Sequence, residues 1–187
     1  NYSVGGNIEK FKNNKIILST GDFQIPENID KNEFIEDDNQ PRKDNLSDPQ
    51  NQSSYFGKIL SIDRSNKNTE IISIGHRNPQ GLFYDFENDI VFSTDHGPKG
   101  GDEVNLNFQN GASIPNYGWD IASYGFPYNG KDIFKKSHKE FGFIEPFKNY
   151  TPSIGISEII NLTKDQNPTS SNNTLYVSSL RAGSIYI

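Results

Sequence analysis

The chain has 187 residues and a formal net charge of −6, and 32% of its residues are hydrophobic while 12% are aromatic. The acidic balance and the lack of a basic stripe argue against nucleic acid as a partner. No apolar run approaches the ~20 residues of a membrane-spanning helix, so we expect no membrane span.

The sequence contains neither cysteine nor methionine. No disulfide can therefore indicate the compartment, and residue 1 is not a translation start. We expect residues 1–187 to be an internal segment of one longer domain, incomplete at both ends.

In chain order, apolar residues alternate in about ten short segments that are separated by turn residues. The predicted strands are Asn7–Lys12, Lys15–Thr20, Phe56–Asp63, Thr69–Ile74, Leu82–Phe86, Ile90–Asp95, Glu103–Phe108, Ile154–Leu162, Thr174–Ser179 and Ser184–Ile187. Such short strands are typical of a sandwich, barrel or propeller, and few segments suit crossover helices. The sequence therefore predicts an all-β fold.

Three longer connections interrupt the strands, at residues 22–54, 116–150 and 164–173. The first contains the acidic run Glu36-Asp37-Asp38 and is either a plain surface loop or part of the rim of a site. The second is rich in glycine and aromatic residues. Within it we expect Trp119 to pack inside the fold, with stacking on a ligand as the alternative, and His138 to lie at the surface.

The hairpin predicted from Leu82 to Asp95 separates two dense polar motifs. These motifs are Gly75-His76-Arg77-Asn78-Pro79-Gln80-Gly81 and His96-Gly97-Pro98-Lys99-Gly100-Gly101-Asp102-Glu103. Because a hairpin brings the segments at its open end together, we expect the two motifs to lie side by side. An arginine, amides, an acidic pair and a Gly-Pro backbone in one small volume indicate a functional site.

Each of these residues also has a purely structural interpretation. Arg77 could be a surface arginine paired with a carboxylate, and Asn78 and Gln80 could cap a turn. Gly97 and Pro98 could form a tight turn beside a solvated acidic pair. The three histidines are too scattered in the sequence to suggest a zinc site, and we expect His76 to pack rather than react.

The order of the motifs resembles the soluble quinoprotein glucose/sorbosone dehydrogenases, which include the aldose sugar dehydrogenases. Besides the two polar motifs, the resemblance rests on Gly5-Gly6, Ser19-Thr20-Gly21-Asp22, Phe56–Asp63, Asn116-Tyr117-Gly118-Trp119, Pro152-Ser153-Ile154 and Ser179-Leu180-Arg181. Members of that family are six-bladed β-propellers that use pyrroloquinoline quinone (PQQ) and calcium. The resemblance therefore implies a partial six-bladed β-propeller, with about two to three blades in this segment.

The resemblance also implies roles for particular residues in the oxidation of an aldose sugar or related alcohol. Arg77 would stabilise the charge that develops at a quinone oxygen as hydride arrives. Gly97 and Pro98 would bind calcium through main-chain carbonyls, with Asp102 helping through water or by fixing the loop. The other implied cofactor-binding residues are Asn78, Gln80, His96, Ser153, Gly155 and Arg181, the last in place of the family's lysine.

The start of the chain departs from the family pattern. The family's general base is a histidine two residues before the glycine pair, where this chain has Ser3, or Tyr2 if one residue is inserted. Neither side chain is a good base near neutral pH. Asp22, which supports that base in the family, would either act as the base itself or merely cap a turn.

Two functions therefore stay open. One is a PQQ- and calcium-dependent dehydrogenase with an altered base, which would use a small sugar or alcohol and an external electron acceptor. The other is a catalytically impaired propeller that serves as a binding or interaction module. Because proteins of this family acquire PQQ outside the cytoplasm, the resemblance implies a periplasmic or secreted location.

Overall fold

The computed structural model describes residues 3–23, 48–111, 113–128, 134–162, 174–181 and 183–187. Over these residues the chain is almost entirely strands and loops. The strands are β1 (Gly5–Phe11), β2 (Lys15–Thr20), β3 (Lys58–Asp63), β4 (Thr69–Ile74), β5 (Pro79–Asp85), β6 (Ile90–Asp95), β7 (Asp102–Phe108), β8 (Lys148–Tyr150), β9 (Ile156–Leu162), β10 (Thr174–Ser179) and β11 (Ser184–Tyr186). Two short 3-10 helices, η2 (Asp48–Gln50) and η3 (Lys139–Phe141), lie in the long connections.

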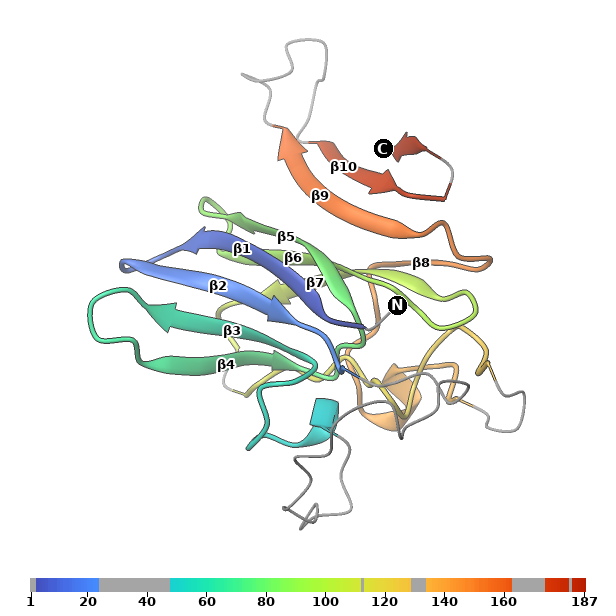
Figure 1. Ribbon diagram of the computed structural model, residues 1–187, viewed down its shortest axis with the longest axis horizontal. Coiled ribbons are helices and arrows are strands. Elements are labelled where there is room, and N and C mark those ends of the chain that lie inside the picture. The colour runs from blue at the N-terminus through green and yellow to red at the C-terminus, as the bar shows by residue number, and fades with distance from the viewer. Residues whose placement is uncertain (1–2, 24–47, 112, 129–133, 163–173, 182) are drawn as a thin grey trace, which may run out of the picture.

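The strands form three antiparallel sheets, each a meander in chain order: β1 to β4, β5 to β8, and β9 to β11. The first strands of the sheets face one another, because β1 contacts β5 and β5 contacts β9. Figure 1 shows the three sheets arranged as successive blades around these inner strands. The predicted all-β partial propeller is confirmed, with two four-stranded sheets and one of three strands.

Alternation along the strands builds two separate cores, because successive side chains point to opposite faces of a sheet. In β5 and β6, Leu82, Tyr84 and Val91 face the first sheet, whereas Phe92 faces the third. The core between the first two sheets consists of Phe11, Ile17, Ile59, Leu82, Tyr84 and Val91. The core between the second and third sheets consists of Phe92, Val104, Ile156, Ile159 and Val177. The two cores thus hold the inner strands β1, β5 and β9 against one another. The loops at the ends of these strands therefore have fixed positions.

All ten predicted strands are confirmed with bounds within three residues, and one further strand among the described residues was missed. The missed strand is β8, whose three residues pair with Asp102 to Val104 of β7. The predicted turn at the tip of the β5–β6 hairpin is confirmed, and the Asp85 carboxylate accepts the backbone N–H groups of Glu87 and Asn88 there. The expectations for Tyr2, the acidic run 36–38 and the loop 164–173 fall outside the described residues.

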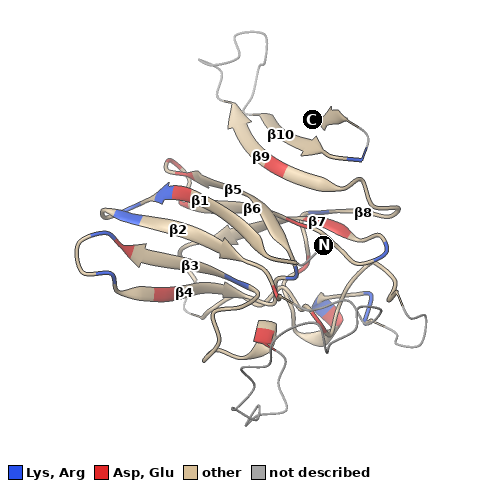
Figure 2. Cartoon of the chain, in the orientation of Figure 1, with Lys and Arg blue, Asp and Glu red and all other residues tan. Residues whose placement is uncertain are grey.

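Charged side chains are dispersed over the described strands and loops. In the view of Figure 2, the Lys and Arg residues among the described residues do not form one continuous stripe. Within the described ranges, no helix is long and apolar enough to cross a membrane.

Candidate functional site

The two polar motifs meet at the open end of the β5–β6 hairpin, as the sequence predicted. Arg77 Nη1 donates to the carbonyl oxygens of both His96 and Gly97, at 3.0 Å each. The backbone N–H of His96 donates to the Asn78 carbonyl at 3.2 Å. Pairing of Pro79 with Asp95 closes the hairpin directly beneath these contacts.

Asp95, which the sequence analysis did not single out, holds the Arg77 turn. Its carboxylate accepts the backbone N–H groups of Arg77 at 3.0 Å and Asn78 at 2.6 Å. It also lies 3.3 Å from Nδ1 of His76, whose Nε2 is 2.8 Å from Ser73 Oγ. His76 is fully buried, which confirms that it packs inside the fold. An acidic residue at the last position of a strand before the second motif was the available signal for this role.

Only some of the hydrogen-bond donors of the Arg77 guanidinium group have a partner among the described residues. Among the described residues Nη1 alone donates hydrogen bonds, and no carboxylate pairs with the group. The guanidinium lies 5.5 Å from the centre of the Trp119 ring, at a distance typical of a cation–π contact. The ion-paired surface arginine considered above is therefore not what the structure shows. Nη2 and Nε remain as donors for an anionic or oxygen-bearing ligand.

Trp119 connects Arg77 with Asp22. Its indole Nε1 donates to Asp22 Oδ2 at 2.7 Å, and the backbone N–H of Asp22 donates to the Arg77 carbonyl at 2.8 Å. Both Asp22 and Trp119 are buried. Trp119 packs within the fold as expected, but it does so inside the site. Gln50 of η2 donates its amide to the Trp119 carbonyl and so fixes the backbone there.

His96 contributes a buried nitrogen without a partner. Its Nε2 makes no hydrogen bond within the described residues. Burial lowers the pKa of His96, and nearby Arg77 lowers it further, against the opposing charges of Asp102 and Asp95. His96 also lines, with Arg77, Gly97 and Glu103, a cavity of about 10 Å³, at the lower size limit for one water molecule. A buried imidazole nitrogen without a partner suits a site that a ligand or a water completes.

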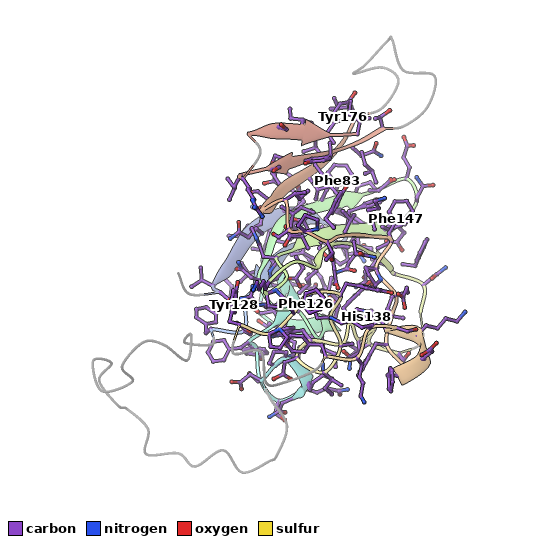
Figure 3. The ribbon with its side chains drawn as sticks, turned by 90° about the vertical axis from the view of Figure 1, so that its right-hand side faces the viewer. Phe83, Phe126, Tyr128, His138, Phe147 and Tyr176 are labelled. Atoms are coloured by element: carbon purple, nitrogen blue, oxygen red, sulfur yellow. The ribbon has the colours of Figure 1, made fainter. Side chains whose placement is uncertain are left out.

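The carbonyls of Gly97 and Pro98 both face donors. Gly97 O accepts from Arg77, and Pro98 O accepts from the Tyr128 hydroxyl at 2.9 Å. Figure 3 shows Tyr128 and Phe126 at one end of the molecule, far from Tyr176. A carbonyl oxygen has a second lone pair, so these donors leave room for a further partner. Within the described residues no group of three or more His, Cys, Asp or Glu side chains could hold a metal ion, and calcium binding here stays a prediction.

The Asp102 carboxylate is fully buried and attaches the second sheet to the third. Oδ1 accepts the backbone N–H of Gly97 at 3.1 Å. Oδ2 accepts from Ser153 Oγ at 2.7 Å and from the N–H groups of Ile154 and Ile156 at 3.0 Å. Of the two roles expected for Asp102, these contacts correspond to fixing the loop. Ligation of a metal through water stays untested.

Ser153, Gly155 and Arg181, which the resemblance implied as cofactor-binding residues, lie together in the structure. Arg181 Nη1 donates to the Ser153 carbonyl at 3.1 Å, and the Gly155 carbonyl accepts the N–H of Leu180 at 2.8 Å. Arg181 itself is exposed, and no carboxylate among the described residues pairs with it. A second unpaired cation therefore stands on the third sheet.

Asn78 and Asn7 bind the inner strands to one another. Asn78 Oδ1 accepts the N–H of Gly5 at 3.0 Å, and Asn7 Nδ2 donates to the Gln80 carbonyl and to Glu158 Oε2. Gly5 adopts a positive φ of 65°, and a Cβ there would lie 2.5 Å from the backbone nitrogen of Gly21. The Asn78 side chain thus hydrogen-bonds to the first sheet rather than capping its own turn. The side-chain amide of Gln80 makes no hydrogen bond within the described residues.

Ser3 is one of the two residues considered at the position of the family's base. It is buried, and its carbonyl accepts the N–H of Phe23 at 3.0 Å. A Cβ on Gly21 would lie 1.8 Å from the Ser3 carbonyl oxygen, so the two backbones are in close contact. Asp22, the residue after this glycine, is the acidic group next to this position.

His138 is a correction to the sequence analysis, which expected it at the surface. It is fully buried, its ring stacks on Tyr124 with centres 5.2 Å apart, and Nε2 lies 3.4 Å from Glu103 Oε1. Burial raises the pKa of Glu103, while His138 opposes that shift. The expectation failed because a single polar residue in a loop carries no signal of the neighbours that cover it.

Comparisons with known proteins identify the family of the chain. The family model described as Glucose / Sorbosone dehydrogenase matches residues 2–187. The chain is 34% identical over 132 residues to the uncharacterized protein slr1608 of Synechocystis sp., covering 64% of this chain and 31% of the relative. It is 42% identical over 72 residues to the aldose sugar dehydrogenase YliI of Escherichia coli, covering 38% of this chain and 18% of the relative.

A solved structure with the same fold is the PQQ-bound form of an aldose sugar dehydrogenase from Streptomyces coelicolor. The TM-score is 0.61 at 20% identity, and the match covers 97% of this chain and 43% of the other. This chain thus spans less than half the length of each of these three proteins.

Proposed function

Because the chain belongs to the glucose/sorbosone dehydrogenase family, we propose that the complete protein oxidises an aldose sugar or a related alcohol with PQQ as its cofactor. The observation that carries this proposal is the guanidinium of Arg77, which no described carboxylate pairs with, beside Nε2 of His96, which has no hydrogen-bond partner among the described residues. A part-buried cation with free donors suits an anionic, oxygen-rich ligand. PQQ, a planar tricarboxylate ortho-quinone, is such a ligand.

Bound PQQ would supply the hydride acceptor. The proposed role of Arg77 is to hold a positive charge where negative charge develops on a quinone oxygen. Its group is oriented in advance by the carbonyls of His96 and Gly97 and by the Trp119 ring. Such prior orientation lets a donor stabilise developing charge without reorganising during the reaction. Ser153, Gly155, Arg181 and the amide of Gln80 complete the proposed contacts.

Removal of the substrate hydroxyl proton needs a base, and this chain has Ser3 where the family has histidine. We assign the role to Asp22, whose buried carboxylate is held by Trp119 Nε1 beside the Arg77 turn. A buried carboxylate can act as general base towards a hydroxyl group that a bound substrate positions beside it. In this proposal Asp22, which follows β2 of the first sheet, removes the proton. Arg77, which precedes β5 of the second sheet, stabilises the developing negative charge.

Calcium dependence is a further part of the proposal. The carbonyls of Gly97 and Pro98 would hold the ion with their remaining lone pairs, because calcium prefers oxygen ligands and tolerates irregular geometry. The ion would supply Lewis-acid character beside the quinone. The external electron acceptor and the periplasmic or secreted location belong to the proposal on family grounds alone.

The alternative function is a propeller that binds a ligand but does not oxidise it. The observation that favours it is the replacement of the family's histidine by the buried Ser3. Adding PQQ and calcium to the complete protein and following dye reduction over a panel of aldoses separates the two functions. Turnover supports the dehydrogenase, tight PQQ binding without turnover supports the binding module, and no PQQ binding defeats the dehydrogenase.

A further inference from the structure

A continuous hydrogen-bonded path joins Arg77 and Arg181, the two arginines of the site that have no carboxylate partner among the described residues. Gly97 accepts from Arg77 through its carbonyl and donates to Asp102 through its N–H. Ser153 accepts from Arg181 through its carbonyl and donates to Asp102 through its hydroxyl. Asp102 is therefore the midpoint of a path that begins on the second sheet and ends on the third.

Asp102, the midpoint of this path, is also held firmly in place. Asp102 has no exposed surface, and its carboxylate accepts four donors, one at Oδ1 and three at Oδ2. Only glycine fits at position 97 without a rearrangement, because a Cβ there would lie 2.1 Å from the Gly100 carbonyl oxygen. A shift of either arginine's backbone support would therefore break hydrogen bonds to a buried charge, a change that is unfavourable.

We propose that Asp102 is a positioning residue that fixes the separation of Arg77 and Arg181, so that both guanidinium groups bind one rigid ligand with at least two anionic or oxygen-bearing groups. The inference rests on the proposed function, in which PQQ is that ligand. Two cations held at a set spacing bind a rigid polyanion better than two mobile cations do, because less conformational freedom is lost on binding. The Asp102 side chain acts only through Gly97 and Ser153.

The variant Asp102→Asn tests this role selectively. The amide oxygen can replace Oδ2 and keep the three donors from Ser153, Ile154 and Ile156. The amide NH₂ then faces the N–H of Gly97, and two donors cannot bond to each other. The substitution should thus separate the Arg77 side of the path from the Arg181 side while the third sheet keeps its contacts.

A matched control is Asp85→Asn. Asp85 is the last residue of β5, at the end of the strand away from the Arg77 turn. Like Asp102, Asp85 is a buried aspartate whose carboxylate accepts backbone and side-chain donors. Its donors are two backbone N–H groups and one side chain, and its role is to cap the β5–β6 hairpin turn. A general loss of stability from replacing a buried aspartate would appear in both variants. An effect on ligand binding should appear in Asp102→Asn alone.

The experiment is a double-variant cycle for PQQ binding in the complete protein. Arg77→Gln, Arg181→Gln and their combination are titrated with PQQ in the wild-type and Asp102→Asn backgrounds. We expect Asp102→Asn alone to lower PQQ affinity roughly tenfold, as for other residues that orient a binding group. In the wild-type background the combined loss should be smaller than the product of the single losses, because each arginine helps the other. In the Asp102→Asn background the losses should multiply.

Equal coupling between the arginines in both backgrounds would overturn the positioning role and leave the proposed function intact. Equal losses of PQQ affinity in Asp102→Asn and Asp85→Asn would overturn it as well. A wild-type protein that does not bind PQQ would defeat the proposed function, and this inference with it.

Discussion

Trp119 Nε1 donates to Asp22 Oδ2 at 2.7 Å, although 97 residues separate the two in the sequence. The same indole ring lies under the guanidinium of Arg77. One side chain from the long loop after β7 therefore orients the proposed base on its edge and the proposed charge-stabilising group on its face. These two functions of Trp119 can be separated by substitution.

Replacing Trp119 by Phe removes the Nε1 donor but keeps an aromatic face, whereas Trp119→Leu removes both. Because a cation–π contact contributes about 0.5–2 kcal/mol, we expect Trp119→Leu to weaken PQQ binding by roughly 2- to 30-fold. Trp119→Phe should bind PQQ within about threefold of wild type but turn over more slowly. PQQ titration and steady-state kinetics measure the two effects. Unchanged PQQ affinity in Trp119→Leu would show that the ring does not hold Arg77 for the ligand.

The assignment of Asp22 as the base predicts a selective loss of turnover in Asp22→Asn. The amide oxygen can still accept from Trp119 Nε1, so the fold around the indole should persist, while the basic charge is gone. Because general base catalysis contributes about 10²- to 10⁴-fold, kcat should fall by that order with PQQ affinity nearly unchanged. Asp85→Asn, which changes a turn cap, should keep full turnover. An Asp22→Asn protein with wild-type kcat would move the base to another residue.

The sequence predicted those features that depend on local alternation. The apolar positions of β5 and β6 gave the hairpin, and the hairpin placed Arg77 beside Gly97 because strand pairing fixes which residues meet. β8 could not be predicted, since three residues with an exposed Lys148 show no alternation. Apolar alternation predicted a strand wherever the strand was long enough for the alternation to repeat.

The contacts that complete the site depend on how the sheets pack, and the sequence does not carry that information. Asp95 was visible as the end of a strand, but not as the acceptor for the Arg77 turn. Asp102 was visible as half of an acidic pair, but not as a group whose donors come mainly from residues 153–156. The family resemblance gave the identity of the candidate residues, and the packing of the sheets gave their partners.

Tyr128 limits access to one of the proposed calcium ligands. Its hydroxyl donates to the Pro98 carbonyl, and its side chain is largely exposed, with 73% of the residue surface accessible. Tyr128→Phe should leave stability within about 0.5 kcal/mol of wild type, as expected for an exposed position. It should also raise calcium affinity a few-fold, because the carbonyl gains a lone pair free of competition. Calcium titration by calorimetry in the presence of PQQ measures this, and weaker binding than wild type would contradict calcium ligation by Pro98.

The buried amine of Lys58 predicts a stability that depends on pH. Its side chain is fully buried, and Nζ donates to the carbonyls of Asp48, Pro49 and Phe56 at 2.6, 3.1 and 2.7 Å. Burial lowers the pKa of Lys58 from 10.5 to about 8, against the opposing charge of Asp48. Between these two pH values the unfolded chain binds more protons than the folded protein, so raising the pH favours the folded state.

We therefore expect the free energy of unfolding of the wild type to rise, relative to that of Lys58→Met, as the pH increases from 8 to 10.5. Below pH 8 both states of the wild type carry the proton, so the difference between the two proteins should be constant. Denaturant unfolding of the complete proteins at pH 7, 8, 9 and 10 measures the difference directly, and the shared titrations of other groups cancel. A difference that falls over this range would mean that the three carbonyls hold the charged amine more strongly than burial opposes it.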